Sequence, residues 1–324
     1  MKIVTVGTGT IVEHFIETAK QINQVEIVGS YSRDLARAEK FSNKMGIGKF
    51  YDSFSTVVED DEVNTVYIAS PNALHFMQAK YFLENNKNVI VEKPLVSESV
   101  NAKELFKIAK ENNLFIFEAI SNVHTPNFSL IKDYLPKLGP IRMVQANYSQ
   151  YSSKYDAFKS GERPNVFNQE FSGGALGDLN IYNIQLIYHL FGKPKEVTYF
   201  PNMVREIDTS GMLVMDYGSF KANATAAKDS ASQCYFQVQG EDGYIISLGA
   251  TNELKNMRVK TKDEDFELDH NTEHRLYGEI VAFSTLFLNN NLEETYKKFE
   301  KSIEVVEILE ESWKQIGYNY KDRK

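Results

Sequence analysis

Residues 2–12 read KIVTVGTGTIV. The run begins with β-branched, apolar residues, and Gly7 and Gly9 follow them closely. This pattern is typical of a strand that enters a glycine-rich turn and then a helix, as in dinucleotide-binding loops. Gly7 permits the tight turn, and Gly9 lets the backbone approach a pyrophosphate. The N–H groups and dipole of the following helix then face the phosphates.

The first 120 residues alternate short apolar runs with helical patterns. The expected strands are Lys2–Val6, Glu26–Tyr31, Thr65–Ala69, Asn88–Val91 and Phe115–Glu118. The expected helices are Glu13–Gln21, Leu35–Lys44, His75–Glu84 and Ala102–Glu111. Strands that are apolar throughout and alternate with helices predict a parallel sheet covered on both faces. With right-handed crossovers, this is a doubly wound α/β domain of the Rossmann type.

The pattern changes after residue 121. Helices are expected at Phe128–Leu135, Gly173–Phe191, Arg275–Leu288 and Leu292–Gln315. Strands are expected at Ile141–Tyr151, Glu196–Met203, Gly211–Tyr217, Phe220–Ala227, Cys234–Gln239, Tyr244–Leu248 and Asn256–Lys260. Consecutive strands without helices between them predict a mainly antiparallel sheet. We therefore expect a dinucleotide-binding domain over 1–120 and an α+β domain with a large open sheet over 121–324.

Composition excludes several classes of function. The chain has 324 residues, with 36 Lys and Arg against 44 Asp and Glu, a net charge of −8. This balance gives no electrostatic reason to expect binding to nucleic acid or to an anionic membrane. The single cysteine, Cys234, cannot form an intrachain disulfide or a cysteine metal cluster, and the histidines lack ligand spacing, so no metal is expected. Without a long apolar stretch, a soluble cytoplasmic protein is expected.

The end of the second strand bears on the choice of cofactor. An acidic residue there commonly holds the ribose hydroxyls of NAD, but this chain has Ser32 and Arg33, followed by Asp34. A guanidinium group can bind a 2′-phosphate through two hydrogen bonds and stack on adenine, which favours NADP. The alternative is that Arg33 is solvated, while Asp34 binds the ribose or only caps the next helix.

A lysine stands at a second strand end. Glu92, Lys93 and Pro94 follow the apolar run 88–91. Open α/β sheets bind ligands at the carboxyl ends of their strands, so Lys93 has the position of a functional residue. The alternative is an ordinary surface lysine at the end of a strand.

The motifs occur in an order that resembles the Gfo/Idh/MocA oxidoreductases, the relatives of glucose–fructose oxidoreductase, inositol dehydrogenase and dihydrodiol dehydrogenase. They are Gly7-Thr8-Gly9, Ser32-Arg33, Ser70-Pro71-Asn72 with His75, Glu92-Lys93-Pro94, and the segment GGALGDLNIY at 173–182. The resemblance covers essentially the whole chain. The chain departs from the family pattern at Val12 and Asn180, where a small residue is usual.

The resemblance implies a set of cofactor-binding residues: Gly7, Thr8, Gly9, Thr10, Ile11, Ser32, Arg33, Ser70, Pro71, Asn72, His75, Glu92 and Lys93. It implies NADP or NAD as the cofactor and a cis peptide bond between Lys93 and Pro94. It also implies a C-terminal sheet through which homodimers or homotetramers form. Glu92 is expected on the cofactor side or in a structural role, and His75 is as consistent with packing as with cofactor contact.

Three residues are the expected catalytic group. Lys93 can stabilise an alkoxide on the substrate, and Tyr182 can donate or accept the proton. Asp178 and Tyr182 are four residues apart, so on a helix they share a face, where Asp178 can orient the substrate or the lysine. The alternatives are a buried aromatic role for Tyr182 and a helix N-terminal carboxylate for Asp178.

We expect an oxidoreductase that transfers a hydride between NADP, or NAD, and a sugar, a polyol or a cyclic diol or carbonyl compound. The main alternative is a catalytically inactive, nicotinamide-binding regulatory protein of the same fold. A sugar-binding module without cofactor is a third hypothesis, which the loop from Gly7 to Gly9 disfavours.

Overall fold

The computed structural model describes residues 1–318 and 320–322, which form two compact units. Unit 1 comprises Met1–Ala119, Leu276–Ile303 and Asp322. Unit 2 comprises Ile120–Arg275 and Glu304–Lys321. The two units therefore do not correspond to a single division of the chain near residue 120, because Leu276–Ile303 packs with unit 1.

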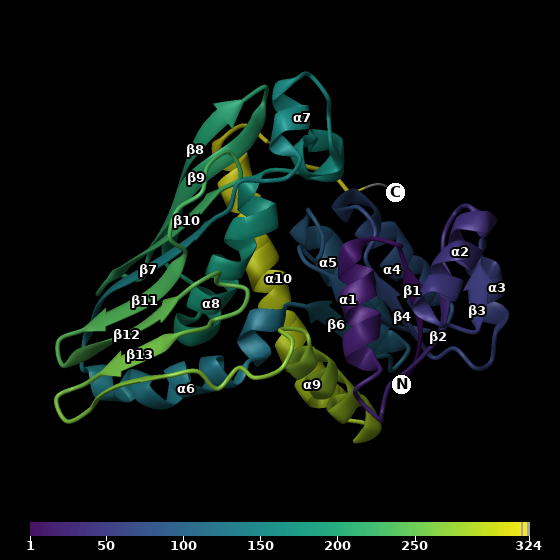
Figure 1. Ribbon diagram of the computed structural model, residues 1–324, viewed down its shortest axis with the longest axis horizontal. Coiled ribbons are helices and arrows are strands. Elements are labelled where there is room, and N and C mark those ends of the chain that lie inside the picture. Colours follow the sequence, from purple (N-terminus) through teal and green to yellow (C-terminus); the bar gives the residue numbers. More distant parts are fainter. Residues whose placement is uncertain (319, 323–324) are drawn as a thin grey trace. The chain divides into compact units, whose positions relative to one another are not determined.

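Unit 1 contains a six-stranded parallel sheet in the order β3-β2-β1-β4-β5-β6 (Figure 1). The strands are β1 (Lys2–Val6), β2 (Glu26–Tyr31), β3 (Lys49–Tyr51), β4 (Thr65–Ile68), β5 (Asn88–Glu92) and β6 (Ile116–Ala119). The helices are α1 (Thr10–Ala19), α2 (Leu35–Met45), α3 (Phe54–Glu59), α4 (His75–Glu84), α5 (Ser99–Glu111), α9 (Tyr277–Leu288) and the first part of α10 (Leu292–Gln315). The expected Rossmann topology is confirmed, with its switch point between β1 and β4.

Aromatic packing explains why α9 belongs to unit 1. The ring of Phe283 on α9 stacks on Phe117 of β6 with centroids 4.5 Å apart, and Phe287 lies 5.3 Å from Phe115. These contacts bury apolar surface that a sheet edge would otherwise expose.

Unit 2 contains an eight-stranded sheet in the order β14-β13-β12-β11-β7-β10-β9-β8. The strands are β7 (Ile141–Ser149), β8 (Glu196–Val204), β9 (Ile207–Asp216), β10 (Lys221–Ala227), β11 (Tyr235–Gly240), β12 (Gly243–Leu248), β13 (Met257–Lys260) and β14 (Asp265–Leu268). The α-helices are α6 (Pro126–Tyr134), α7 (Tyr155–Lys159), α8 (Ile181–Phe191) and the second part of α10. Every neighbouring pair is antiparallel except β7 and β10, so the expected mainly antiparallel sheet is confirmed.

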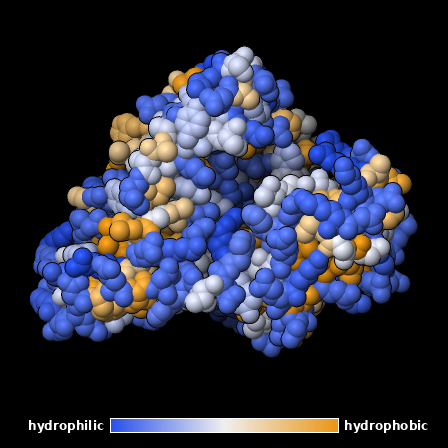
Figure 2. All heavy atoms as spheres, viewed as in Figure 1, coloured by the Kyte–Doolittle hydropathy of each residue, from blue (hydrophilic) through white to orange (hydrophobic). Residues whose placement is uncertain are grey.

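The two faces of this sheet differ. On β7, Val144, Ala146 and Tyr148 are buried and join the core with α8. Their neighbours point to the other face, where Met143 is 42% exposed and Met212 of β9 is 40% exposed. Figure 1 shows α8 along the buried face, and no helix of the described residues is drawn over the other. Figure 2 shows hydrophobic atoms among hydrophilic ones over these strands.

The expected helix from Gly173 to Phe191 is wrong at its start. The segment Leu176–Asn180 is a π-helical turn, and α8 begins only at Ile181. The expectation failed because the glycines at 173 and 174 serve close packing rather than helix formation. Wide turns of this kind occur often at functional sites.

Within the described parts of the chain, no helix is long and apolar enough to cross a membrane. The same residues include no group of three or more His, Cys, Asp or Glu side chains placed to hold a metal ion.

Candidate active site

The turn between β1 and α1 has the geometry of a phosphate-binding loop. Gly7 has φ +122°, and a Cβ there would lie 2.7 Å from the carbonyl oxygen of Ala69, so glycine is required. Gly9 precedes α1, and a Cβ on it would meet nothing within 4 Å. The N–H groups of Thr10 and Ile11 begin the helix, where helix geometry provides no acceptor. Thr8, Gly9 and Thr10 are at least partly exposed, so the loop can accept a pyrophosphate.

The carboxyl end of β2 presents an arginine. Arg33 is exposed, and Ser32 is half-buried, with its N–H bonded to Tyr51 O at 3.1 Å. Asp34 is the N-cap of α2, and its Oδ1 accepts a hydrogen bond from the N–H of Arg37 at 3.3 Å. Asp34 therefore caps α2, as one of its two alternatives expects. Arg33 remains as the exposed charge where a 2′-phosphate would bind.

Lys93 directly follows β5 and is half-buried. Its N–H donates to Glu92 Oε2 at 3.2 Å, and the Lys93–Pro94 peptide bond is cis, as the resemblance implied. Glu92 is 8% exposed, and its Oε1 accepts a hydrogen bond of 2.6 Å from the hydroxyl of Tyr67 on β4. The carboxylate of Glu92 thus fixes the backbone from which Lys93 projects.

His75 joins two of the predicted segments. It is fully buried, its Nε2 lies 2.9 Å from Ser70 O, and its Nδ1 lies 3.0 Å from Pro94 O. Burial lowers the pKa of the imidazole, since desolvation disfavours its charged form. A neutral ring donates its one N–H to one of these two carbonyl oxygens and packs against the other, so His75 lies between the loop after β4 and the loop after β5. Of that first loop, Ser70, Pro71 and Asn72 are partly exposed, and Ser70 Oγ bonds Gln78 Oε1 at 2.7 Å.

In unit 2, the segment from Gly173 to Asp178 is held by close packing. A Cβ on Gly173 would lie 2.7 Å from Asn165 O, and one on Gly174, where φ is +129°, would overlap Asp208 Oδ1. A Cβ on Gly177 would lie 3.0 Å from the Trp313 ring. Neighbouring groups occupy the Cβ positions of Gly173 and Gly174, so glycine is required at both, while a Cβ on Gly177 would be a tight contact.

Asp208 lies beneath this segment. It is fully buried, and its Oδ2 accepts hydrogen bonds of 2.8 Å from the N–H of Leu176 and from the hydroxyl of Tyr199. Burial raises the pKa of Asp208 to about 6. The carboxylate therefore anchors the start of the π-helical turn that carries Asp178.

Asp178 is paired with a lysine that the sequence interpretation missed. Lys228 Nζ lies 2.5 Å from Asp178 Oδ2, and the side chain of Lys228 is only 2% exposed, against 31% for Asp178. Lys228 directly follows β10, whose buried positions are all alanine. Like Lys93 after β5, it is a lysine at the end of a strand, and this position was the available signal. Asp178 does lie in the first turn of the π-helical segment, as the alternative of a helix N-terminal carboxylate expects, and its carboxylate also forms this ion pair.

Tyr182 lies in the first turn of α8 and is 5% exposed, with its ring 5.9 Å from that of Tyr148. Its carbonyl oxygen accepts a hydrogen bond of 2.9 Å from Asn122 Nδ2, which also donates to Thr251 O at 3.0 Å. A buried asparagine thus fixes the backbone of Tyr182 against the loop after β12.

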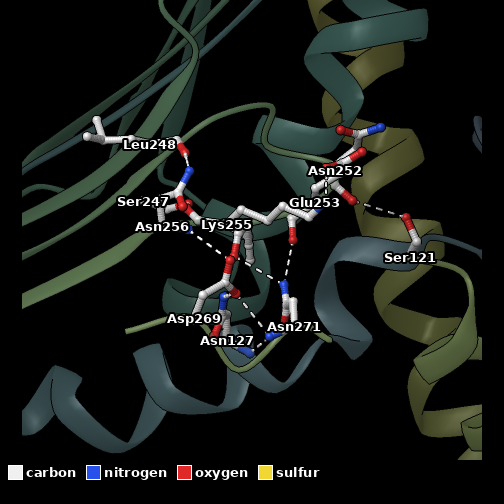
Figure 3. Close-up of polar contacts among 11 residues, drawn as sticks. Ser121, Asn127, Ser247, Leu248, Asn252, Glu253, Lys255, Asn256, Asp269 and Asn271 are labelled. Carbon is white, nitrogen blue, oxygen red and sulfur yellow. Dashed lines mark hydrogen bonds and ion pairs between the residues drawn. The ribbon is translucent and has the colours of Figure 1, made fainter. Parts of the chain in front are cut away.

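That loop is held by a second polar network (Figure 3). Asn127 Nδ2 donates to Leu254 O at 2.5 Å and to Asp269 Oδ1 at 2.8 Å, while Asn271 Nδ2 donates to Glu253 O at 2.6 Å. Side-chain donors on backbone carbonyls hold an irregular loop that has no ladder of its own. Because this loop carries Thr251, the network also supports the position of Tyr182.

Both departures from the family pattern are buried. Val12 is fully buried within the core of unit 1, and a Cβ added at Gly7 would lie 3.4 Å from its Cγ2. Asn180 is fully buried, donates to Ala224 O at 2.8 Å and accepts from Asn183 Nδ2 at 2.8 Å. Val12 therefore serves packing, and Asn180 joins the end of the π-helical turn to β10.

Comparisons with known proteins agree with this geometry. Residues 1–119 match the oxidoreductase family with an NAD-binding Rossmann fold, and residues 136–246 match the C-terminal domain of the same family. The chain is 33% identical over 323 residues to scyllo-inositol 2-dehydrogenase (NADP(+)) IolU of Bacillus subtilis, covering 99% of this chain and 98% of that protein. The chain belongs to the Gfo/Idh/MocA oxidoreductase family.

Two further comparisons extend to lower identity. Trans-1,2-dihydrobenzene-1,2-diol dehydrogenase of Xenopus laevis is 24% identical over 330 residues, covering 97% of each chain. The crystal structure of KijD10, a 3-ketoreductase from Actinomadura kijaniata in complex with NADP and TDP-benzene, superposes with a TM-score of 0.84 over 95% of each chain, at 20% identity. Family membership makes this protein an NAD(P)-dependent oxidoreductase that acts on CH–OH groups.

Proposed function

We propose that this protein is an NADP-preferring dehydrogenase or reductase whose substrate is a polyol, a sugar or a related cyclic diol. The observation that carries this proposal is the similarity to an NADP(+)-dependent scyllo-inositol dehydrogenase along 99% of the chain. The dihydrodiol dehydrogenase of Xenopus laevis supports the same class, because both substrates are rings that carry adjacent hydroxyl groups.

The residues of unit 1 fit the cofactor. The positive φ of Gly7 and the open space beside Gly9 suit a pyrophosphate at the start of α1. The exposed Arg33 supports the preference for NADP, because Asp34 is engaged as a helix cap. We assign direct contacts to the remaining predicted residues of these loops: Thr8, Thr10, Ile11, Ser32, Ser70, Pro71 and Asn72. Glu92 and His75 hold the Lys93 backbone and its neighbouring loops instead of binding the cofactor themselves.

When bound, the nicotinamide ring supplies the hydride chemistry. Lys93 donates a hydrogen bond to the reacting oxygen and stabilises the negative charge that develops there. Tyr182 exchanges the proton of that hydroxyl group, and Asp178 orients the reacting groups.

We propose that the open face of the unit 2 sheet forms a homodimer or homotetramer interface. Phe200, Met212 and Leu248 on this sheet are 59%, 40% and 43% exposed. Phe200 and Met212 lie directly opposite one another on β8 and β9, and contiguous apolar surface of this kind is typical of a subunit contact. Phe200→Lys with Met212→Lys should reduce the mass measured by light scattering to that of a monomer. We also propose a cytoplasmic location, consistent with the single cysteine.

The proposed function is tested by measuring reduction of NADP+ and NAD+ with scyllo-inositol, myo-inositol, D-xylose and a trans-dihydrodiol. Oxidation of at least one of these, with a higher kcat/KM for NADP+ than for NAD+, is the expected result. Tight NADPH binding without turnover of any of them, in either direction, would favour the inactive regulatory alternative instead.

A further inference from the structure

A buried lysine in unit 2 has a constrained position. The N–H of Lys228 donates to Thr209 O at 2.8 Å, and its carbonyl oxygen accepts from the N–H of Ser152 at 2.9 Å. The backbone is therefore fixed on both sides, by β9 and by the loop after β7. The Cα of Lys228 is therefore held in a fixed position, from which its side chain extends.

The side chain of Lys228 is surrounded by groups that favour a cation. Its Nζ donates to Val166 O at 3.1 Å and lies 4.7 Å from the ring centroid of Phe167. Phe167 is 1% exposed and belongs to a small core with Phe158. A carbonyl oxygen and an aromatic face both stabilise an ammonium group that has lost its water.

The ammonium group ends on Asp178 Oδ2 at 2.5 Å. A lysine that is 2% exposed has little contact with water, so its charge requires compensation, which this carboxylate supplies. Asp178 is more exposed than Lys228 and lies on the π-helical turn. Hydrogen bonds from neighbouring residues hold this turn in place. Lys228 therefore fixes one oxygen of Asp178, whose side chain is 31% exposed.

We infer that Lys228 is a positioning residue for the oxidoreductase reaction, acting through Asp178. It holds the Asp178 carboxylate in one orientation, and it ties that orientation to the segment at Val166 and Phe167. This inference rests on the proposed role of Asp178. A residue that touches neither substrate nor cofactor then controls the rate.

The test is a double-mutant cycle of Lys228→Met and Asp178→Asn, each measured for kcat, for KM of NADP+ and for KM of scyllo-inositol. Lys228→Met alone should lower kcat by roughly 10- to 100-fold and leave the KM of NADP+ within about twofold. If Lys228 acts through Asp178, adding Lys228→Met to Asp178→Asn should cause no further loss of kcat. If Lys228→Met does not fold, Lys228→Gln takes its place.

Lys221→Met is the matched control. Lys221 lies at the other end of β10 and forms a 2.6 Å ion pair with Asp216, but its side chain is 55% exposed. This variant should keep the wild-type kcat, because the exposed pair supports no site residue. If the loss of any ion-paired lysine lowered kcat, Lys221→Met would be slow as well as Lys228→Met.

Two contrary outcomes are distinguishable. Suppose that Asp178→Asn lowers kcat and that adding Lys228→Met lowers it further, by the same factor as in the wild type. Lys228 then does not act through Asp178, and the inference is wrong. If Asp178→Asn keeps full activity, the role of Asp178 is wrong and that of Lys228 falls with it. Neither result bears on the hydride transfer or on the role of Lys93, because these are tested with other variants.

Discussion

The carboxylate of Asp322 accepts hydrogen bonds from the backbone N–H of Ser97, at 2.9 Å and 3.2 Å, across 225 residues of sequence. The same carboxylate accepts from the N–H of Glu98 at 3.3 Å and from Asn101 Nδ2 at 2.9 Å. Asp322 thereby caps the beginning of α5, where Glu98, the N-cap residue, forms no side-chain cap. The capped segment lies only a few residues after Lys93.

Removal of this cap should weaken unit 1. Asp322→Ala leaves the buried N–H of Ser97 without its acceptor, so we expect a loss of roughly 1–3 kcal/mol in the free energy of unfolding. Denaturant unfolding measures this, with Glu39→Ala, an exposed carboxylate on α2, as the control. Equal stability of the two variants would show that Asp322 is not an anchor.

Arg33 should decide the choice between the two nicotinamide cofactors. Arg33→Ala removes an exposed guanidinium at the end of β2, and we expect roughly 10- to 100-fold weaker binding of NADP+ with little change for NAD+. Calorimetric titration with both cofactors measures the ratio. Arg37→Ala, one turn further along α2, is the control. An unchanged ratio of the two affinities in Arg33→Ala would assign the preference to another residue.

The glycine at 174 should be irreplaceable because of Asp208. Gly174→Ala places a Cβ against Asp208 Oδ1 at a φ of +129°, whereas Gly161→Ala, at a φ of +109°, meets nothing within 4 Å. Both variants incur backbone strain of about 1–3 kcal/mol, so the additional loss in Gly174→Ala measures the steric contact. Thermal unfolding of the pair distinguishes these contributions. Equal losses would show that the neighbouring carboxylate adapts without cost.

Asp208 should make stability depend on pH. Its folded pKa of about 6 is above the ordinary aspartate pKa of 3.8, so between these values the folded protein holds more protons than the unfolded chain. The free energy of unfolding therefore falls as the pH rises through this window, by about 3 kcal/mol in total. Asp208→Asn removes the titrating group, so its stability should fall less than that of the wild type between pH 4 and pH 7. Parallel stability curves for the two proteins would contradict this account.

Much of the fold was predictable because its elements are long and regularly patterned. The strands β1, β2 and β5 are apolar runs bounded by turns, and their bounds were predicted within one residue. Two short strands were missed. Lys49–Tyr51 has only three residues, and Asp265–Leu268 carries charges on alternate positions, so neither gave a clear apolar signal.

The candidate site was predictable where the chain itself forms the geometry. Lys93 follows a strand, and the glycines at 7 and 9 follow another, so local sequence was sufficient. The partners supplied from a distance were not predictable. Lys228 reaches Asp178 over 50 residues of sequence, and Asp208 supports Leu176 from 32 residues away. Periodicity describes one element at a time and cannot specify such pairs.

The central claim is that Lys93 stabilises charge on the reacting oxygen, and Lys93→Met tests it most directly. We expect kcat with NADP+ and scyllo-inositol to fall by roughly 10³-fold, while NADP+ still raises the melting temperature as it does for the wild type. Lys107→Met, an exposed lysine on α5, should keep wild-type turnover. Turnover of Lys93→Met within about threefold of the wild type would contradict the account.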